Sequence, residues 1–310
     1  MQYTKLGRTN VEVSRLCLGT NNFGSQLSEE QAAKVIRRAV DLGISFIDTA
    51  NVYVDGRSEE IIGNAIKGDR SRVVIATKVG YAMSGDPEGI NLSRKSILSK
   101  AGDSLRRLKT DHIDLYYLHG FDLSVPLEES LPAMDQLVKD GKVGHVGISN
   151  FSAEQLKEAT RICEENDLAE PVALQPRYNL MVRDPEKELL PLCEKQGLGV
   201  VTYSPLAGGF LTGKYSKGAQ PPAGTRGAFN ENYWKRYNND ESFAKLERLS
   251  KVASDARIPL ATLAISWILS KPAVTAPIVG ASLPEQVEQN CRVLETKVPS
   301  QVYAKLESAL

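Results

Sequence analysis

Short apolar runs alternate with longer amphipathic segments along most of the chain, and each pair has the spacing of a strand followed by a helix. The apolar runs, which we predict to be strands, cover residues 16–19, 44–47, 73–77, 113–118, 143–148, 172–174, 199–202 and 274–279. The amphipathic segments, which we predict to be helices, cover residues 28–42, 58–66, 93–108, 127–139, 152–166, 185–196 and 284–294, a pair within 241–270, and 300–309.

Residues at the ends of the amphipathic segments support the helix prediction. Serines stand where a helix N-cap is expected at Ser28, Ser93 and Ser152. A glutamine three residues after the first and the last of these completes the pattern of a capping box. Glycines follow three segments where a left-handed C-cap favours them, at Gly43, Gly141 and Gly197.

Eight strand–helix alternations predict an α/β fold with parallel strands joined by right-handed crossovers. An open doubly wound sheet is the alternative, but the first run continues as Leu-Gly-Thr-Asn-Asn-Phe-Gly and lacks the G-x-G-x-x-G turn of such sheets. Residues 2–14 read as two extended pieces around a turn. We therefore predict a (β/α)8 TIM barrel with an N-terminal β-hairpin, forming one domain over residues 1–310.

The connection between the seventh and eighth strands is about 70 residues long. Its part at 207–240 is rich in glycine and proline and contains an aromatic and basic run at 233–237. Loops this long in compact domains are usually functional or disordered. We interpret this long loop after strand 7 as a lid over a ligand; a mobile surface insertion is the alternative.

Composition narrows the classes of partner. The 38 basic and 38 acidic side chains balance, so there is no electrostatic reason to expect nucleic acid or an anionic membrane as partner. No apolar stretch approaches the roughly 20 residues that span a bilayer, and the N-terminus lacks the apolar core of a signal peptide.

Cysteine spacing gives a second constraint. The four cysteines lie far apart without a C-x-x-C pair, at Cys17, Cys163, Cys193 and Cys291. We therefore predict neither a disulfide framework nor a structural zinc or other metal site, and a reducing, cytoplasmic location is expected.

Polar residues end seven of the eight predicted strands. They are Thr20, Asp48, Lys78, His119, Ser149, Asn150, Gln175, Tyr203 and Ser204, while the eighth strand ends at Gly280. In a barrel of this kind chemistry collects at the carboxyl ends of the strands, where side chains converge on one mouth. Polar groups around an apolar mouth are the usual form of a small-molecule site.

Taken singly, the most reactive of these residues have ordinary explanations. Asp48 could cap a turn, Tyr53 could be a packing residue, and His119 could be a hydrogen-bonded core histidine. Lys78 could lie at the surface, but it follows an apolar strand and should be partly buried. A buried ammonium needs a carboxylate, and Asp48 one strand away is the candidate. The four together at neighbouring strand ends favour a functional site.

These four residues make chemical sense as an acid assembly. A free tyrosine has a pKa of about 10, and a nearby lysine cation favours the phenolate and lowers that pKa. An aspartate would hold the lysine in place, and a histidine could orient a substrate oxygen. Such a group suits protonation of an oxygen that gains negative charge, as in hydride addition to a carbonyl. The hydride must come from a cofactor.

The sequence resembles the aldo-keto reductase superfamily over nearly its whole length. The motifs that carry the resemblance are Leu-Gly-Thr at 18–20, Phe-Ile-Asp-Thr-Ala-Asn-Val-Tyr at 46–53, Ser-Glu at 58–59, Thr-Lys at 77–78, Ile-Asp-Leu-Tyr-Tyr-Leu-His at 113–119, Gly-Ile-Ser-Asn at 147–150 and Tyr-Ser-Pro-Leu at 203–206. The Leu-Thr-Gly-Lys-Tyr stretch at 211–215 points to the branch that includes bacterial reductases and potassium-channel β subunits.

The resemblance implies that Tyr53 is the general acid, that Lys78 and Asp48 tune it, and that His119 orients a small-molecule carbonyl substrate. It implies NADP(H) as cofactor. NAD(H) is less favoured. In many members basic residues that clamp the 2′-phosphate stand at the positions of Gly280 and Gln286, and their absence here weakens the preference for NADP(H). The implied cofactor residues are Gly19, Thr20, Asn21, Asp48, Ser149, Asn150, Gln175, Tyr203, Ser204, Pro205, Leu206, Ala207, Lys214, Arg226, Gly280, Ser282, Gln286, Gln289 and Asn290. Candidate substrate-pocket walls, each equally interpretable as packing, are Tyr81, Phe121, Asp122, Tyr233 and Trp234.

Two other functions are considered. A nicotinamide-nucleotide-sensing regulatory subunit with vestigial catalysis is disfavoured because all four catalytic candidates are present, and we expect no partner-binding extension before Met1 or after Leu310. A phosphate-binding barrel lyase or isomerase without nicotinamide is not rejected by the fold alone. Substrate identity, oligomeric state and reaction direction are left open by the sequence.

Overall fold

A closed barrel of parallel strands forms the centre of the computed structural model, which describes residues 1–87 and 89–310. Around the barrel the strands follow the order β10-β3-β4-β5-β6-β7-β8-β9. Their bounds are β3 (Cys17–Gly19), β4 (Phe46–Asp48), β5 (Val74–Val79), β6 (Ile113–Leu118), β7 (Val143–Ser149), β8 (Pro171–Gln175), β9 (Gly199–Thr202) and β10 (Val274–Gly280). The predicted (β/α)8 barrel is confirmed.

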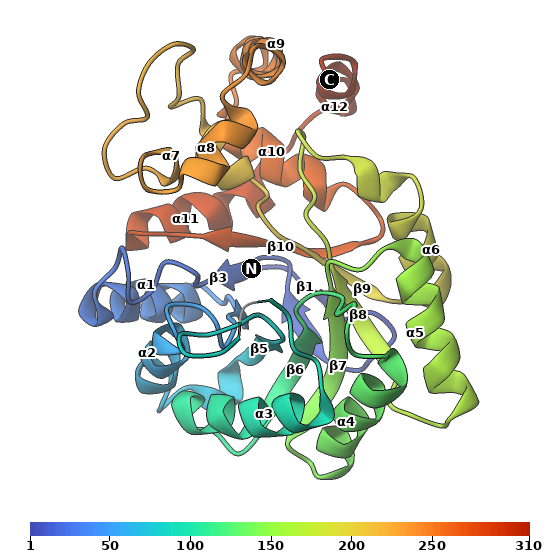
Figure 1. Ribbon diagram of the computed structural model, residues 1–310. Helices are drawn as coiled ribbons and strands as arrows, with labels where there is room; N and C mark the ends of the chain where they lie inside the picture. The colour runs from blue at the N-terminus through green and yellow to red at the C-terminus, as the bar shows by residue number, and fades with distance from the viewer. Residues whose placement is uncertain (88) are drawn as a thin grey trace.

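Helices surround this barrel, and α9 and α12 lie beside each other at its outer edge (Figure 1). Their bounds are α1 (Glu29–Asp41), α2 (Arg57–Ala65), α3 (Arg94–Leu108), α4 (Leu127–Lys139), α5 (Ala153–Glu165), α6 (Leu189–Gln196), α9 (Asp240–Ala256), α10 (Leu260–Leu269), α11 (Pro284–Arg292) and α12 (Ser300–Ser308). The capping boxes predicted at Ser28 and Ser152 are present. The helix predicted at 185–196 is instead a 3-10 turn at Asp184–Glu186 followed by α6.

The predicted hairpin closes the amino end of the barrel. Its strands, β1 (Tyr3–Lys5) and β2 (Glu12–Ser14), pair antiparallel. Gly7 in the turn has φ +55°, and a Cβ there would lie 2.5 Å from the amide nitrogen of Gly199. Only glycine fits this close approach. Leu6 and Val13 are fully buried and pack with the barrel interior, so the hairpin plugs the end opposite to the strand carboxyl ends.

Alternation along each strand sends successive side chains to opposite faces. Along β6, Leu115 and Tyr117 belong to the cluster inside the barrel, whereas Tyr116 and Leu118 pack between the strands and the helices. In β5, Ala76 also lies inside. The same alternation places Lys78 on the interior face and Thr77 on the helix side.

The long segment after β9 is not a continuous loop. It contains a 3-10 turn at Ala207–Thr212 and the short helices α7 (Arg226–Phe229) and α8 (Glu231–Tyr237). The side chain of Asn230 accepts a hydrogen bond from the Tyr233 amide at 2.8 Å and so begins α8. Phe210 stacks with the rings of Tyr215 and Tyr237. The predicted lid segment is therefore folded onto its own aromatic cluster.

Helix α10 is the most apolar of the long helices. Its Leu263, Ala264, Trp267 and Ile268 are fully buried in the layer between strands and helices. Within residues 1–87 and 89–310 no single helix is long and apolar enough to cross a membrane; α9 and α10, bent by 94°, pass that test only as a pair, by length and composition.

Candidate active site

The carboxyl ends of β4, β5 and β6 bring four predicted residues to one mouth. Asp48 is the last residue of β4, Lys78 lies near the end of β5, and His119 follows β6 directly. Tyr53 stands in the turn between β4 and α2. Parallel register pairs Asp48 with Ala76, so Lys78 lies just beyond Asp48 along the neighbouring strand.

Lys78 is the centre of the site. Its side chain has no solvent exposure. The ammonium donates to Asp48 Oδ1 at 2.6 Å, to the carbonyl of Thr49 at 2.6 Å and to the hydroxyl of Tyr53 at 3.4 Å. An ammonium has three protons, so these acceptors use all of its donors and fix its position. The carboxylate partner expected for a buried lysine is therefore present as Asp48.

Hydrogen bonds connect this centre to the next strands. Gln175 Nε2 donates to the second carboxylate oxygen of Asp48 at 2.8 Å, and the Ser149 hydroxyl donates to the Gln175 carbonyl at 2.9 Å. Asn150 Nδ2 donates to Ser149 Oγ at 3.1 Å, and Tyr203 donates to Asn150 Oδ1 at 2.7 Å. The predicted polar strand ends from β4 to β9 thus form one network.

His119 lies beside the phenol and is almost fully buried. Its ring contacts Tyr53 and Tyr81 edge to face, with ring centroids 6.0 Å and 4.7 Å away. Burial, with a smaller contribution from the Lys78 charge, lowers the pKa of His119 to about 2. The imidazole is therefore neutral at physiological pH, and its buried Nδ1 has no hydrogen-bond partner among the described residues.

The pKa of Tyr53 shifts in the direction opposite to the one predicted from the sequence. Burial raises the pKa of its phenol above the usual value, and the nearby Lys78 charge lowers that pKa only in part. Burial likewise opposes the Lys78 ammonium, but Asp48 and Tyr53 together raise the pKa of Lys78. The prediction that the Lys78 cation lowers the pKa of the phenol is wrong in the net direction of the shift, because it left out desolvation by burial. At neutral pH the phenol carries its proton and Lys78 its charge.

The loop after β9 contains several left-handed residues close together. Ser204 (φ +56°), Ala207 (φ +47°), Gly208 (φ +60°) and Gly209 (φ +97°) are left-handed. The amides of Ala207 and Gly209 donate to the carbonyls of Ser204 and Leu206, at 2.9 Å each, so these residues form a tight turn. Gly209 has φ +97°, a conformation that favours glycine, and Lys214 Nζ lies over the loop 2.9 Å from where a Cβ would stand.

Two cations flank this loop. Neither Lys214 nor Arg226 forms an ion pair with any other residue that the structure describes; each lies over a tyrosine ring, Lys214 over Tyr215 at 5.5 Å and Arg226 over Tyr233 at 5.8 Å. Lysine and arginine without carboxylate partners are suited to phosphate groups. This donor set therefore fits the pyrophosphate of a dinucleotide.

The start of α11 is the predicted site for the adenosine end. The Ser282 amide donates to Gln286 Oε1 at 2.7 Å, so Gln286 is used to hold this turn. Asn22, which the sequence did not single out, donates to Ser282 Oγ at 3.3 Å and ties the β3–α1 loop to this segment. Gln289 is exposed and Asn290 half-buried on α11, and Asn21 is exposed beside Asn22. The first residue of α11 is Pro284, which has no amide hydrogen, and the Gln286 amide donates to the Leu283 carbonyl at 3.1 Å, so few amides are free there.

Other predicted cofactor residues have fixed structural contacts. The Thr20 hydroxyl donates to the Asp48 carbonyl at 2.9 Å and is fully buried. A Cβ on Gly19 would lie 2.7 Å from Ile278, where β3 and β10 pair. These two residues hold strand ends together. Pro205 is buried, Leu206 half-buried and Gly280 exposed.

Only some of the predicted pocket walls face the mouth. Tyr81 is exposed and contacts His119, and Phe121 packs edge-on against Phe151 with centroids 5.3 Å apart. The carboxylate of Asp122 accepts from the Leu92 amide at 2.8 Å and from Ser124, so it organises its loop.

The two aromatic residues of α8 contact the lid segment itself. Tyr233 donates to the Ala207 carbonyl, and its ring lies against Gly208. Trp234 packs on Tyr215, with ring centroids 5.3 Å apart. These contacts support a packing role for both, beneath the loop that follows β9.

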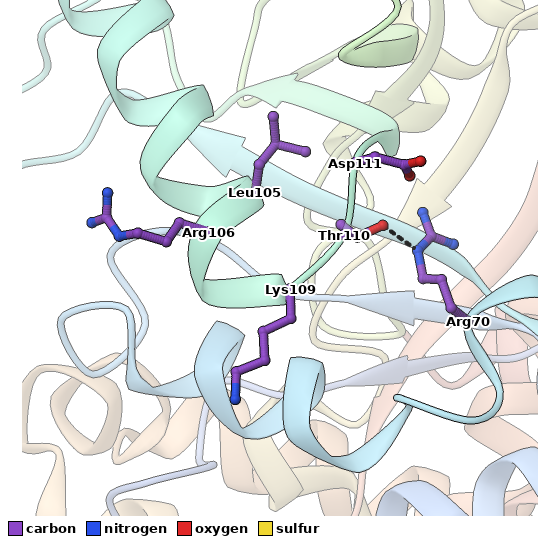
Figure 2. A pocket seen from close by; sticks show the side chains of 6 residues that line it. All are labelled: Arg70, Leu105, Arg106, Lys109, Thr110 and Asp111. Carbon is purple, nitrogen blue, oxygen red and sulfur yellow. Dashed lines mark hydrogen bonds between the residues drawn. The ribbon is translucent and has the colours of Figure 1, made fainter.

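A depression of about 610 Å³ lies away from this mouth. Figure 2 shows that this depression lies where the end of α3 leads into β6. Arg70 Nε donates a hydrogen bond to the Thr110 hydroxyl, whereas the side chains of Arg106 and Lys109 point away from Arg70. Its lining residues are Arg70, Leu105, Arg106, Lys109, Thr110 and Asp111. None of the residues predicted for the site lines it.

Comparisons with known proteins agree with this geometry. The profile of the aldo/keto reductase family matches residues 15–310. The chain is 40% identical over 303 residues to a rice protein named probable voltage-gated potassium channel subunit beta, covering 95% of this chain and 92% of the relative. It is 38% identical to a Bacillus subtilis protein named as an uncharacterized oxidoreductase, covering 99% and 95%. It is 33% identical to L-glyceraldehyde 3-phosphate reductase of Escherichia coli K12, covering 95% and 88%. The chain therefore belongs to the aldo/keto reductase family.

Proposed function

We propose that the protein is an NADP(H)-dependent oxidoreductase that reduces aldehydes or ketones to alcohols, with Tyr53 as general acid. The observation that carries this proposal is the position of the Lys78 ammonium, 2.6 Å from the Asp48 carboxylate and 3.4 Å from the Tyr53 hydroxyl. A neutral phenol beside a fixed cation is suited to giving its proton to an oxygen that becomes negative.

The roles of the four residues follow from their charges. When bound, the nicotinamide cofactor supplies the hydride. The neutral His119 ring can donate a hydrogen bond to the carbonyl oxygen and orient it beside Tyr53. Tyr53 then protonates that oxygen, and the Lys78 ammonium stabilises the phenolate left behind. Asp48 keeps Lys78 charged and in place.

The cofactor would lie across the mouth from β7 to β10. Side chains of Ser149, Asn150 and Gln175 would hold the nicotinamide carboxamide, and the ring of Tyr203 would stack on the nicotinamide. Stacking of this kind contributes roughly 0.5–1.5 kcal/mol beyond area burial. The loop at 204–207 with Lys214 and Arg226 would bind the pyrophosphate.

NADP(H) is proposed over NAD(H) for the adenosine end. The Ser282 hydroxyl offers a donor to a 2′-phosphate at the positive end of the α11 dipole, and Asn22 holds Ser282 in place. Gln286 would act indirectly, because its side-chain oxygen already accepts from the Ser282 amide. Four further residues lie around this turn and would contact the adenosine: Gly280, Gln289, Asn290 and Asn21.

A second candidate is a nicotinamide-nucleotide-sensing subunit without effective turnover. The observation that favours it is the name of the rice relative, a probable potassium channel subunit. The two candidates share cofactor binding and differ in catalysis. We also propose a cytoplasmic location, since all four cysteines are free thiols.

The deciding experiment measures consumption of NADPH and of NADH with a panel of aldehydes, ketones and sugars. The panel includes a phosphorylated aldehyde because of the name of the Escherichia coli relative. We expect turnover with NADPH that exceeds turnover with NADH. Tight NADPH binding without turnover on any carbonyl would favour the sensing subunit. Failure to bind either dinucleotide would reject both.

A further inference from the structure

A carboxylate with no solvent exposure lies at the start of α2. Glu59 accepts from the Thr77 hydroxyl at 2.5 Å through one oxygen and from Arg107 Nε at 2.7 Å through the other. Its partners belong to β5 and α3, so one side chain joins three elements. A carboxylate buried in this way is tolerated only when it is well paired.

The first partner adjoins the lysine of the site. Thr77 directly precedes Lys78 on β5, and the two side chains point to opposite faces of the strand. Lys78 reaches into the mouth, while Thr77 reaches outward to Glu59. The bond to Glu59 therefore ties α2 to the strand segment that carries the Lys78 ammonium.

The second partner lies beneath the turn that presents Tyr53. A Cβ on Gly56 would lie 2.6 Å from Arg107 Cδ and 2.7 Å from its Nε, so the backbone of the turn lies directly on this side chain. The amides of Gly56 and Ser58 both donate to the Tyr53 carbonyl, at 3.2 Å and 3.4 Å. Movement of Arg107 would thus be transmitted to Tyr53.

The turn itself needs such support. Val54, Asp55 and Gly56 are consecutive left-handed residues, with φ of +50°, +52° and +87°. A branched residue such as valine is strained there, at a cost on the order of 1–3 kcal/mol, and the conformation persists only where the surroundings hold it. Arg107 below Gly56, together with the hydrogen bonds of Asp55 to Ser84, supplies that support.

We propose that the Glu59–Arg107 ion pair is a positioning unit that sets the distance between the Tyr53 hydroxyl and the Lys78 ammonium. Thr77 links it to the lysine, and Gly56 links it to the tyrosine. The inference rests on the proposed function, and it assigns the pair to the proton-donating step and not to cofactor binding. Neither residue touches the mouth.

The test compares Arg107→Lys with the matched control Arg106→Lys. Arg107→Lys keeps a cation but loses the planar group beneath Gly56. Displacements of about 1 Å at a reacting group can lower rates by about a hundredfold, so we expect kcat to fall about ten- to a hundredfold while the Kd for NADPH stays within twofold. Arg106 is largely exposed and pairs with Asp103, and its variant should retain wild-type kcat.

A second readout does not depend on turnover. Tyrosine labelled with a stable isotope gives an NMR signal for Tyr53, identified by its loss in Tyr53→Phe, whose position follows ionisation of the phenol. In Arg107→Lys we expect the Tyr53 signal to shift and its pKa to rise, because the phenol moves away from Lys78. The Arg106→Lys signal should match wild type.

A paired variant guards against loss of the fold. Glu59→Gln with Arg107→Met replaces both charges by neutral groups of similar length, which removes the problem of an unpaired buried charge. This protein should fold and bind NADPH, yet show the low kcat. A wild-type kcat and an unchanged Tyr53 signal in Arg107→Lys would overturn the inference, as would an equal loss of NADPH affinity. A wild-type protein that turns over no carbonyl would refute the proposed function, while the NMR comparison still decides the positioning role.

Discussion

The hydroxyl of Tyr53 lies 3.4 Å from the Nζ of Lys78, inside a site where the lysine itself is sealed from water. While Tyr53 is a neutral phenol, the cation gains little from it beyond a weak hydrogen bond. Once the phenol gives up its proton, a negative oxygen faces that cation at low local dielectric, where charge–charge attraction is much stronger than in water. The arrangement therefore stabilises the state after proton transfer more than the state before it.

The first prediction concerns this proton. Tyr53→Phe removes the hydroxyl and keeps the ring beside His119. If Tyr53 is the general acid, kcat for carbonyl reduction should fall about 10²–10⁴-fold, the usual value of general acid catalysis. NADPH affinity should stay close to wild type, because Tyr53 is not among the residues proposed to bind the cofactor. Single-turnover kinetics and NADPH titration by fluorescence measure the two quantities.

Tyr81→Phe is the control for that experiment. Tyr81 also contacts the His119 ring, but no hydrogen bond joins it to Lys78 among the described residues. Its variant should keep kcat within about tenfold. An equal loss of kcat in the two variants would mean that activity depends on both tyrosine hydroxyls alike and that Tyr53 is not the general acid.

The second prediction concerns stability. Asp48→Asn leaves the Lys78 ammonium buried without a carboxylate, and Lys78→Met leaves the Asp48 carboxylate without its cation. Each should lower the free energy of unfolding by about 3–5 kcal/mol, as expected when one member of a buried ion pair is removed. The double variant should lose less than either single variant. Urea unfolding measures all four proteins, and a double loss equal to the sum of the single losses would show that the two side chains are uncoupled.

Much of this site could be predicted because its evidence is local in the sequence. Each strand is a short apolar run, and barrel closure brings the polar residue at the end of one run beside the next. The pairing of Lys78 with Asp48 followed from a single rule, that a lysine at the end of an apolar strand needs a buried carboxylate.

Features that depend on packing between distant segments were not predicted. Helices α7 and α8 are too short to be stable alone, and they form because Tyr233 and Trp234 pack on the rest of the lid segment. The direction in which the pKa of Tyr53 shifts depends on how deeply the phenol is buried, and the sequence does not give that burial. Arg107 and Glu59 lie 48 positions apart, and nothing in the local pattern joins them.

The third prediction separates cofactor binding from catalysis. Lys214→Ala and Arg226→Ala each remove a cation that has no ion-pair partner in the described part of the chain. Charge-assisted hydrogen bonds to phosphate contribute roughly 1.5–3 kcal/mol, so the Kd for NADPH should rise about ten- to a hundredfold in each. At saturating NADPH, kcat should change little. Lys217→Ala, on the same segment but paired with Asp240, is the control and should bind NADPH as wild type does.

The last prediction concerns the pH dependence of stability. Burial lowers the pKa of His119 to about 2 in the folded protein, below its ordinary 6.5. Below pH 6.5 the unfolded chain takes up a proton at His119 that the folded protein does not accept. The full stability at this site is therefore present above the unfolded pKa and is lost as pH falls, by about 1.4 kcal/mol per pH unit for one proton.

His119→Gln provides the comparison, because it keeps a polar side chain that does not titrate. Urea unfolding of both proteins at several pH values gives the difference in their free energies of unfolding. That difference should shift in favour of the variant by about 1.4 kcal/mol for each unit below the ordinary histidine pKa, since the other titrating groups are common to both proteins. A difference that stays constant down to about pH 5 would show that the folded protein holds His119 with an ordinary pKa. In that case His119 would be charged beside Lys78 in mild acid, and its proposed role as a neutral hydrogen-bond donor would not hold there.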